Sequence, residues 1–255
     1  TDTFNVAVGF QAGNDITTGT SNTLIGSLAG DAITTGGSNV AVGTSALSAN
    51  TTASYNTAVG HEAGHSQTTA GFNTFIGRLS GYTNTTGSQN TSVGVNSFRL
   101  NTTGQYNTVI GKSALEANTT GNYNVALGHT ALVSNTTASN NTAVGYQAGY
   151  TNVAAGAQVF VGYKAGYATT NGGGSSTFVG YEAGLSNTTG GNNTALGRGS
   201  FLDNTTGSNN VGLGYDALAN NTTASNNTAV GYKAGYSNTT GVHNIAIGAT
   251  AMQNT

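Results

Sequence analysis

The stretch that decides the fold reads NTAVGYKAGYSNTTG, residues 227–241, and variants of it fill the chain. Its opening Asn-Thr-Ala-Val-Gly, or a close variant, begins at residues 5, 22, 39, 56, 73, 90, 107, 124, 141, 158, 176, 193, 210, 227 and 244. Every step is 17 residues, apart from 18 between Gln158 and Ser176. Self-similarity at a fixed period is the signature of a repeat protein. The sequence therefore predicts a single array over residues 1–255, and we expect a piece of a longer fibre because the chain begins and ends within a unit.

Numbering each unit from its first residue separates fixed positions from variable ones. Position 5 is always Gly, position 4 is always Val, Ile or Leu, and position 8 is always Ala or Ser. Position 1 is Asn in thirteen of the fifteen units, and positions 12 to 14 usually read Asn-Thr-Thr. Positions 6, 7 and 10 vary among Tyr, Lys, Glu, His, Arg and Gln. We interpret the fixed positions as the framework of each unit.

The fixed positions predict an all-β fold, a parallel β-solenoid (β-roll) of about fifteen coils. Positions 2 to 4 form a short β-branched strand, and the Gly that follows marks a corner with positive φ or close backbone approach. Helices are disfavoured because Gly recurs within each unit and apolar residues lack the spacing of 3, 4 and 7. We expect positions 2 and 4 to point inward, with the aliphatic residue of position 4 packed against the small residue of position 8. Copies of one coil would then stack at about 4.8 Å per turn.

Position 3 would then point outward. It is never charged, and includes Leu24, Phe75, Val109, Phe160 and Phe178. An uncharged outer column is what an interface between copies of the chain would present, so we expect lateral association into a homo-oligomer. A surface that merely tolerates small residues is the alternative interpretation.

Asparagine recurs at two positions of the unit. At position 1, stacked side-chain amides would bond to one another from coil to coil. At position 12 the Asn-Thr-Thr triplets are also formal N-glycosylation sequons, at Asn50, Asn84, Asn101, Asn118, Asn135, Asn187, Asn204, Asn221 and Asn238. Ile16 and Ile33 occupy the same position in early units, which favours an inward-pointing ladder. A glycosylated surface fibril is the alternative.

Tyrosines recur at positions 6 and 10. Tyr146, Tyr150, Tyr163, Tyr167, Tyr232 and Tyr236 are candidate glycan contacts. Stacked rings can form a platform for sugar rings, but rows of this kind also serve as packing between neighbouring strands. Both interpretations are open at the level of the sequence.

One motif with catalytic associations is a coincidence of the repeat. Residues His61 to His65 match the H-E-x-x-H zinc motif, which requires a helix to bring both histidines to one face. The same slots read Tyr-Gln-Ala-Gly-Tyr at residues 146–150, so the histidines are variants at freely changing positions. No acid–base pair or nucleophile recurs along the array. We therefore expect no enzyme activity, no cofactor and no metal site.

The composition excludes further classes of protein. Charged residues are 5% of the chain, against about 25% in an average soluble domain. No basic run could neutralise phosphates, so we expect no nucleic-acid partner. No stretch approaches the roughly 20 apolar residues of a membrane-spanning helix, so we expect no membrane insertion by this segment.

The motif Asn-Thr-Ala-Val-Gly-x-x-Ala, at residues 56–63, 141–148 and 227–234, resembles the head repeats of trimeric autotransporter adhesins. The full unit is similar to repeat arrays in bacterial and phage fibre proteins. The resemblance covers essentially the whole chain and implies a left-handed parallel β-roll, usually trimeric, that carries an adhesive surface. The adhesin repeats are shorter, and the extra length here lies around Asn-Thr-Thr-Gly.

These observations together predict an extracellular, non-catalytic structural or adhesive fibre segment at a cell or virion surface. A glycan-binding receptor fibre, like those of phage tails, is an alternative that depends on the tyrosine rows. An ice-binding solenoid is a further alternative, suggested by the threonine columns. Its weakness is that the paired threonines are adjacent, so their side chains would point to opposite faces.

Overall fold

The computed structural model describes residues 3–170 and 174–253. The chain divides into two units, residues 1–124 and 125–255, and each is a parallel β-solenoid. The described residues contain strands, turns and bends but no helix. The predicted fold class is confirmed.

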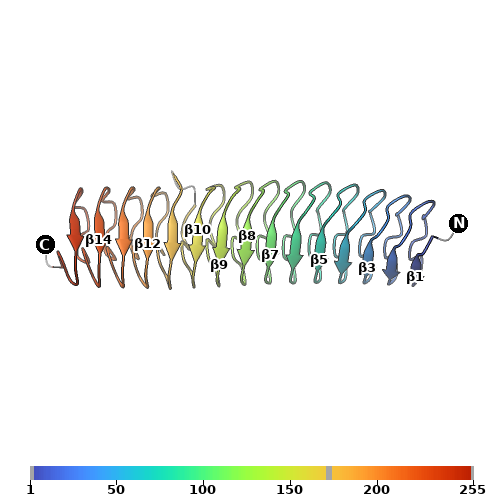
Figure 1. Ribbon diagram of the computed structural model, residues 1–255, viewed down its shortest axis with the longest axis horizontal. Coiled ribbons are helices and arrows are strands. Elements are labelled where there is room, and N and C mark those ends of the chain that lie inside the picture. Colours follow the sequence, from blue (N-terminus) through green and yellow to red (C-terminus); the bar gives the residue numbers. More distant parts are fainter. Residues whose placement is uncertain (1–2, 171–173, 254–255) are drawn as a thin grey trace. The chain divides into compact units, whose positions relative to one another are not determined.

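Each coil contributes one three-residue strand, at positions 2 to 4 of the repeat. The first unit contains β1 (Val6–Val8), β2 (Thr23–Ile25), β3 (Val40–Val42), β4 (Thr57–Val59), β5 (Thr74–Ile76), β6 (Thr91–Val93) and β7 (Thr108–Ile110). The second contains β8 (Val125–Leu127), β9 (Thr142–Val144), β10 (Val159–Val161), β11 (Thr177–Val179), β12 (Thr194–Leu196), β13 (Val211–Leu213), β14 (Thr228–Val230) and β15 (Ile245–Ile247). Figure 1 shows the strands of each unit side by side in chain order.

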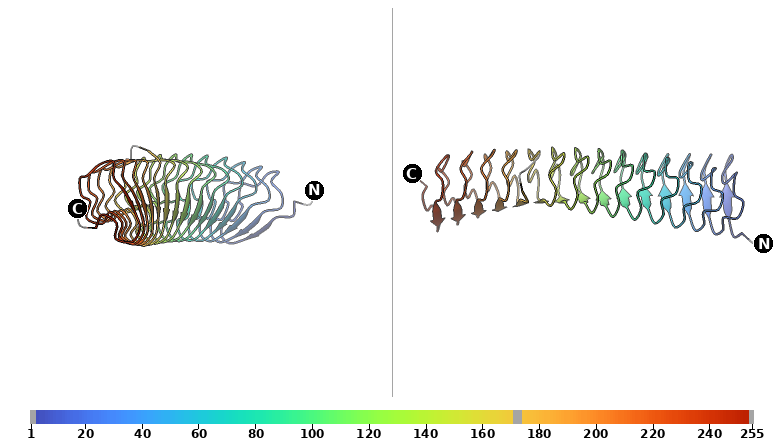
Figure 2. Two further views of the ribbon diagram at one scale, coloured as in Figure 1. Left: turned by 60° about the vertical axis from the view of Figure 1, so that its left-hand side comes forward. Right: turned by 90° about the horizontal axis from the view of Figure 1, so that it is seen from above.

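Within each unit, strands pair in parallel and in the register of the repeat. Thr57 of β4 lies opposite Thr74 of β5, and Val59 lies opposite Ile76. The same position-on-position pairing holds across the longer step, where Val161 of β10 lies opposite Val179 of β11. Like residues therefore meet from coil to coil, and Figure 2 shows this repetition from two further directions.

The glycine at position 5 is required by close approach of successive coils. Gly60 has φ +136°, and a Cβ placed on it would lie 2.7 Å from the carbonyl carbon of Gly77. Real Cβ atoms do not come this close to backbone, and this φ disfavours any side chain. Both expected reasons for the glycine corner are confirmed.

Three further positions of the coil adopt positive φ without requiring glycine, which the sequence did not indicate. At position 9, for example, Leu47 has φ +52° and Phe98 has φ +54°. Every residue at position 7 has φ between +51° and +61°, including the β-branched Thr130 and Thr250. Position 17 is similar, as in Tyr55 with φ +63°. Such backbone is unfavourable for most residues. Hydrogen bonds to the preceding coil stabilise it, as where the Glu62 N–H donates to the Thr44 carbonyl at 2.9 Å.

The inner and outer faces of the strand are the reverse of the prediction. Position 3 is buried, and Leu24, Phe75, Val109, Phe160 and Phe178 have no exposed area. Positions 2 and 4 point outward and are half-buried or exposed. The predicted alternation is confirmed but its phase is wrong, because the β-branched and aliphatic residues at positions 2 and 4 resemble the buried face of a strand. The predicted interface along position 3 is therefore excluded.

Position 3 varies in size because position 9 compensates for it. Many pairs combine a large residue with a small one, as in Leu24 with Gly30, Phe75 with Gly81, Ala41 with Leu47 and Ser92 with Phe98. Where both are small, as in Ala58 with Gly64, the adjacent coils fill the space, since a Cβ on Gly64 would lie 2.9 Å from Phe75 and 3.0 Å from Leu47. A Cβ on Gly81 would lie 2.5 Å from Cε1 of Phe75. The small residue of position 8 faces position 3 as well, since Ser80 Oγ donates to Ser92 Oγ at 3.0 Å. The expected packing of position 8 against position 4 is corrected accordingly.

The predicted asparagine ladder at position 1 is present in both units. Oδ1 of Asn39 accepts from the backbone N–H of Asn56 at 3.0 Å and from its Nδ2 at 3.2 Å. Nδ2 of Asn56 also donates to the Ala70 carbonyl at 3.1 Å, which ties the coil back on itself. These side chains are buried, so each amide supplies partners to groups that water cannot reach.

The 18-residue coil keeps the ladder by using a longer amide. Nε2 of Gln158 donates to the Gly174 carbonyl at 2.8 Å, and its Oε1 accepts from the Ser176 N–H at 2.9 Å. The Ser176 Oγ then accepts from the Asn193 N–H at 3.2 Å. The two exceptions to asparagine therefore preserve the function of the ladder.

Exchanging the large and small partners of one coil tests the core. We expect Gly81→Leu alone to lower the free energy of unfolding by about 1–3 kcal/mol through overpacking. Phe75→Ala alone should lower it by about 3–5 kcal/mol through a cavity. The double variant reproduces the Ala41 and Leu47 combination and should lose much less than the sum, as measured by denaturant unfolding of all four proteins. If the losses of unfolding free energy in the single variants simply added up in the double variant, positions 3 and 9 would not compensate for each other in size.

The ladder is tested by Asn210→Ala. The change removes the acceptor of the Asn227 N–H, a 2.9 Å bond, and the donor to the Ala224 carbonyl, also 2.9 Å. Buried groups without partners cost about 1–3 kcal/mol each, so we expect unfolding to become easier by roughly 2–4 kcal/mol. The matched control is Asn226→Ala, at the exposed position 17 where Ala157 occurs naturally. If both variants lost the same free energy of unfolding, the ladder would contribute no more to stability than an exposed asparagine.

Candidate functional site

In each unit the outward side of the strands is uncharged, and we define the outer strand face as positions 2 and 4 of the strands of a unit. Position 2 is Thr, Val or Ile in every coil, and position 4 is Val, Ile or Leu. Ile25, Ile110 and Leu196 are 41%, 46% and 50% exposed. The sequence analysis missed this face, although the unbroken β-branched pattern at position 2 was a signal for it.

The sequon asparagines form a second internal ladder. All nine are buried, with the largest exposure 7% at Asn238. Nδ2 of Asn101 donates to Oδ1 of Asn84 at 2.6 Å, and Nδ2 of Asn204 donates to Oδ1 of Asn187, also at 2.6 Å. A sugar on Nδ2 would have to replace these bonds and occupy the interior. The contacts are those of the ladder interpretation.

Two rows of tyrosines run along the second unit. At position 6 the rings of Tyr146, Tyr163 and Tyr181 are stacked, with centroids 5.4 and 4.9 Å apart. At position 10 the rings of Tyr150 and Tyr167 lie 5.1 Å apart. The structure thus brings four of the six candidate glycan contacts into stacked pairs. Tyr232 stacks instead on Tyr215 at 5.5 Å, while Tyr236 lies beside Lys233.

The orientation of these rings bears on what they can bind. Interplanar angles of 11–16° mean that each ring covers the face of its neighbour. A sugar platform needs a free aromatic face, whereas these rings expose their edges. Lys164 lies 5.4 and 5.5 Å from the centroids of Tyr163 and Tyr167, where it adds cation–π contacts. The geometry fits packing between coils better than sugar stacking.

The two threonine columns have different environments. At position 13 the hydroxyl donates to the next coil, as where Thr205 Oγ1 donates to the Thr222 carbonyl at 3.1 Å. At position 14 the side chain is exposed, as in Thr206 and Thr223. The threonines at position 2, such as Thr91 and Thr108, are also exposed, and the residue beside them on the outward face of the strand, at position 4, is aliphatic and not the second threonine that an ice-binding surface would use. The sequence predicted that the adjacent threonines at positions 13 and 14 point to different faces, and their different environments agree with that prediction.

The His61 to His65 stretch does not form a metal-binding face. Nδ1 of His61 lies 3.5 Å from a carboxylate oxygen of Glu62, whereas the ring of His65 stacks on Tyr82 at 5.0 Å. Gly64 between them has φ +60°, so the segment is a turn. Across residues 3–170 and 174–253, no three His, Cys, Asp or Glu side chains are grouped so that they could hold a metal ion.

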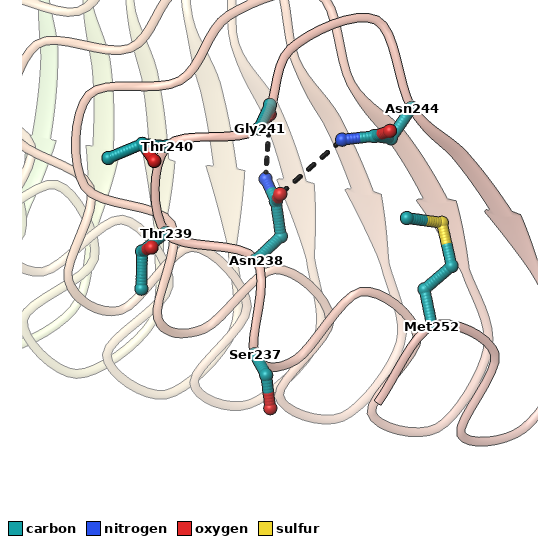
Figure 3. A pocket seen from close by; sticks show the side chains of 7 residues that line it. All are labelled: Ser237, Asn238, Thr239, Thr240, Gly241, Asn244 and Met252. Atoms are coloured by element: carbon teal, nitrogen blue, oxygen red, sulfur yellow. Dashed lines mark hydrogen bonds between the residues drawn. The ribbon is translucent and has the colours of Figure 1, made fainter. Parts of the chain in front are cut away.

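A pocket in the second unit is lined by Ser237, Asn238, Thr239, Thr240, Gly241, Asn244 and Met252 (Figure 3). Within it, Nδ2 of Asn238 donates to the Gly241 carbonyl at 3.0 Å, and Nδ2 of Asn244 approaches Oδ1 of Asn238 at 3.4 Å. None of the lining side chains is acidic or basic. The pocket lining therefore offers no side chain that could act as a general acid or base.

Comparisons with known proteins assign neither a family nor a function to the chain. No family model matches the chain, and neither curated proteins nor solved structures give a match. The resemblance to adhesin heads and fibre arrays therefore stays a prediction. Within the described part of the chain, no helix has the length and apolar character needed to cross a bilayer.

The environment of Asp31 moves the pKa of its carboxyl group. Burial raises the pKa of Asp31, and the charge of Asp15 raises it further, while backbone hydrogen bonds act in the opposite direction. Its Oδ1 is buried and has no hydrogen-bond partner. The charged form of Asp31 is therefore disfavoured in the folded coil.

This raised pKa predicts a pH-dependent stability. Because the folded state holds the proton more tightly than the unfolded state, stability falls as pH rises from the ordinary aspartate range through the raised pKa. We expect Asp31→Asn to raise the melting temperature at pH 7, with the difference vanishing below a pH of about 3. Thermal unfolding followed by circular dichroism over pH 3–8 measures this. A difference between the two proteins that is the same at pH 3 and at pH 8 would contradict the prediction.

Proposed function

We propose that this chain is a non-catalytic segment of an extracellular structural and adhesive fibre that associates with copies of itself through the outer strand face. The observation that carries the proposal is the absence of any charged residue at positions 2 and 4 in all fifteen coils. Surfaces of soluble monomers rarely keep long uncharged apolar columns without a partner. The resemblance to adhesin and fibre repeats supports an extracellular setting.

The environment of the outer strand face supports self-association. Apart from Leu127, Leu196 and Leu213, its residues are short and β-branched, so they lose little side-chain entropy when a second copy covers them. Successive strands repeat in register, so two copies can match column to column over many coils. A coil that holds one or two large apolar side chains buries little area by itself, which makes lateral packing favourable.

The adhesive part of the proposal rests on how variation is distributed. The ladders and the core restrict positions 1, 3, 5, 8 and 12 to uncharged residues, whereas positions 6, 7 and 10 change from coil to coil and include charged ones. At these variable positions, side chains such as His61 and Tyr232 are exposed. A framework of this kind can present different contacts while its backbone stays the same.

Self-association is tested with paired charges on adjacent strands. Sedimentation velocity should show the protein as an oligomer at micromolar concentration. We expect Val144→Lys combined with Val161→Glu to weaken association roughly ten-fold or more, because both charges would be desolvated in the interface. Val144 and Val161 lie opposite each other in β9 and β10, so the introduced charges attract and the coil is preserved.

The matched control places the same charges on another surface. Thr206→Lys with Thr223→Glu occupies position 14, which is exposed on adjacent coils. This variant should associate like the unmodified protein. A protein that stays monomeric at all concentrations, or a control that dissociates equally, would refute the proposed interface.

A further inference from the structure

An uninterrupted row of flat side chains follows position 6 through seven coils of the second unit. Its members are His129, Tyr146, Tyr163, Tyr181, Arg198, Tyr215 and Tyr232. The guanidinium of Arg198 lies 5.6 Å from the Tyr181 ring and 5.2 Å from the Tyr215 ring. Arg198 therefore separates a group of three stacked tyrosines from a group of two.

Stacked tyrosine pairs occur at two other positions of the coil. Tyr150 and Tyr167 pair at position 10 in the second unit. In the first unit, Tyr106 and Tyr123 pair at position 17, with centroids 4.9 Å apart and ring planes within 1°. Tyr123 is 56% exposed, and Tyr150 and Tyr167 are half-buried, so small oxidants can reach both pairs.

We infer that these tyrosine pairs are sites of oxidative cross-linking, in which a covalent bond joins neighbouring coils. The oxidant is hydrogen peroxide activated by a peroxidase. Each tyrosine of a pair loses one electron and its phenolic proton, giving two tyrosyl radicals. The radicals couple through the ring carbons ortho to the oxygen. The two ortho ring hydrogens then leave as protons while the phenolic oxygens regain theirs, so two hydrogen atoms in total reduce one peroxide to two waters.

The geometry favours coupling within a pair. The backbone register holds successive tyrosines one coil apart, so a radical on one ring always has the same neighbour within about 5 Å. Holding reactants in this way converts a bimolecular step into an effectively unimolecular one. The rings must tilt out of the parallel stack for their ortho carbons to meet, and they lie on the surface of the coils, half-buried or exposed.

The cross-link would supply what the sequence otherwise lacks. The chain has no cysteine, and its coils are joined by hydrogen bonds and packing. A bond between Tyr146 and Tyr163 closes a loop of one repeat, which restricts the unfolded chain as a disulfide would. The inference stands independently of the proposed self-association, because both rings of each pair belong to one chain.

The chain also contains its own controls. Tyr55 stacks on Phe72 and Tyr82 stacks on His65, with centroids 5.0 Å apart in both cases. Neither neighbour can supply a second tyrosyl radical. Both tyrosines therefore share the stacked environment but lack the partner.

The experiment treats the folded full chain with peroxidase and hydrogen peroxide at low concentration. Equal amounts of unlabelled and ¹⁵N-labelled protein are mixed first, so that bonds within and between chains are distinguished by mass spectrometry of digested peptides. We expect bonds joining Tyr106 to Tyr123, Tyr146 to Tyr163, Tyr163 to Tyr181, Tyr150 to Tyr167 and Tyr215 to Tyr232, all within one chain. Their yield should exceed that at Tyr55 or Tyr82 by roughly ten-fold or more.

Two variants make the test specific. Tyr163→Phe keeps the ring stack but removes the phenol, so the bonds to Tyr146 and Tyr181 should disappear while the Tyr215 to Tyr232 bond remains. Arg198→Tyr joins the two groups, and new bonds from position 198 to Tyr181 and to Tyr215 should appear. Tyrosine is the commonest residue at this position, so the coil accepts it.

Three results would overturn the inference. Cross-links that form equally at Tyr55 and Tyr82 would show that stacking has no influence. Bonds that join labelled to unlabelled chains would place the reaction between molecules. Unchanged cross-links in both variants would show that neighbouring coils are not the partners.

Discussion

The amide of one buried asparagine per coil is the interaction on which the rest of the structure depends. Its Oδ1 accepts from both the backbone N–H and the Nδ2 of the next coil, as between Asn39 and Asn56. These bonds fix the height and the register of each coil at the point where its strand begins. Where asparagine is absent, Gln158 and Ser176 provide the same acceptors. Position 1 therefore requires a side chain that accepts a hydrogen bond from the next coil, and this side chain need not be asparagine.

In-register stacking explains why strained backbone persists in this fold. Residues of every kind adopt positive φ at position 7, a conformation that isolated chains rarely populate. Residues at this position donate their N–H to the coil before, as from Glu62 to Thr44 and from Lys164 to Tyr146, and these bonds offset the strain. The array can then turn sharp corners without proline and without glycine at every corner. Side-chain identity at these corners becomes free to vary.

The same stacking turns single residues into columns with collective properties. One threonine or valine on a surface has little meaning, but the outer strand face repeats them in every coil. A lone tyrosine is likewise ordinary, whereas Tyr146, Tyr163 and Tyr181 form a continuous stack. The first column suits contact with another chain, and the second suits reaction within one chain. Both follow from a framework in which variable positions are held at a constant spacing.

The sequence by itself determined the period, the strand at positions 2 to 4, the glycine corner and the asparagine ladder. Each of these features depends on residue types that recur at a fixed interval, and such a recurrence can be read from the sequence of a single chain. Only the tertiary structure decided which face of the strand is buried, because alternation defines two faces and does not say which one meets the rest of the coil. The deciding contact, Phe75 against Gly81, joins positions 3 and 9, and its compensation of size becomes visible only when the coil closes. For the same reason, the sequence could not decide whether the tyrosine rings stack on one another, since the orientation of a ring depends on its neighbours in space.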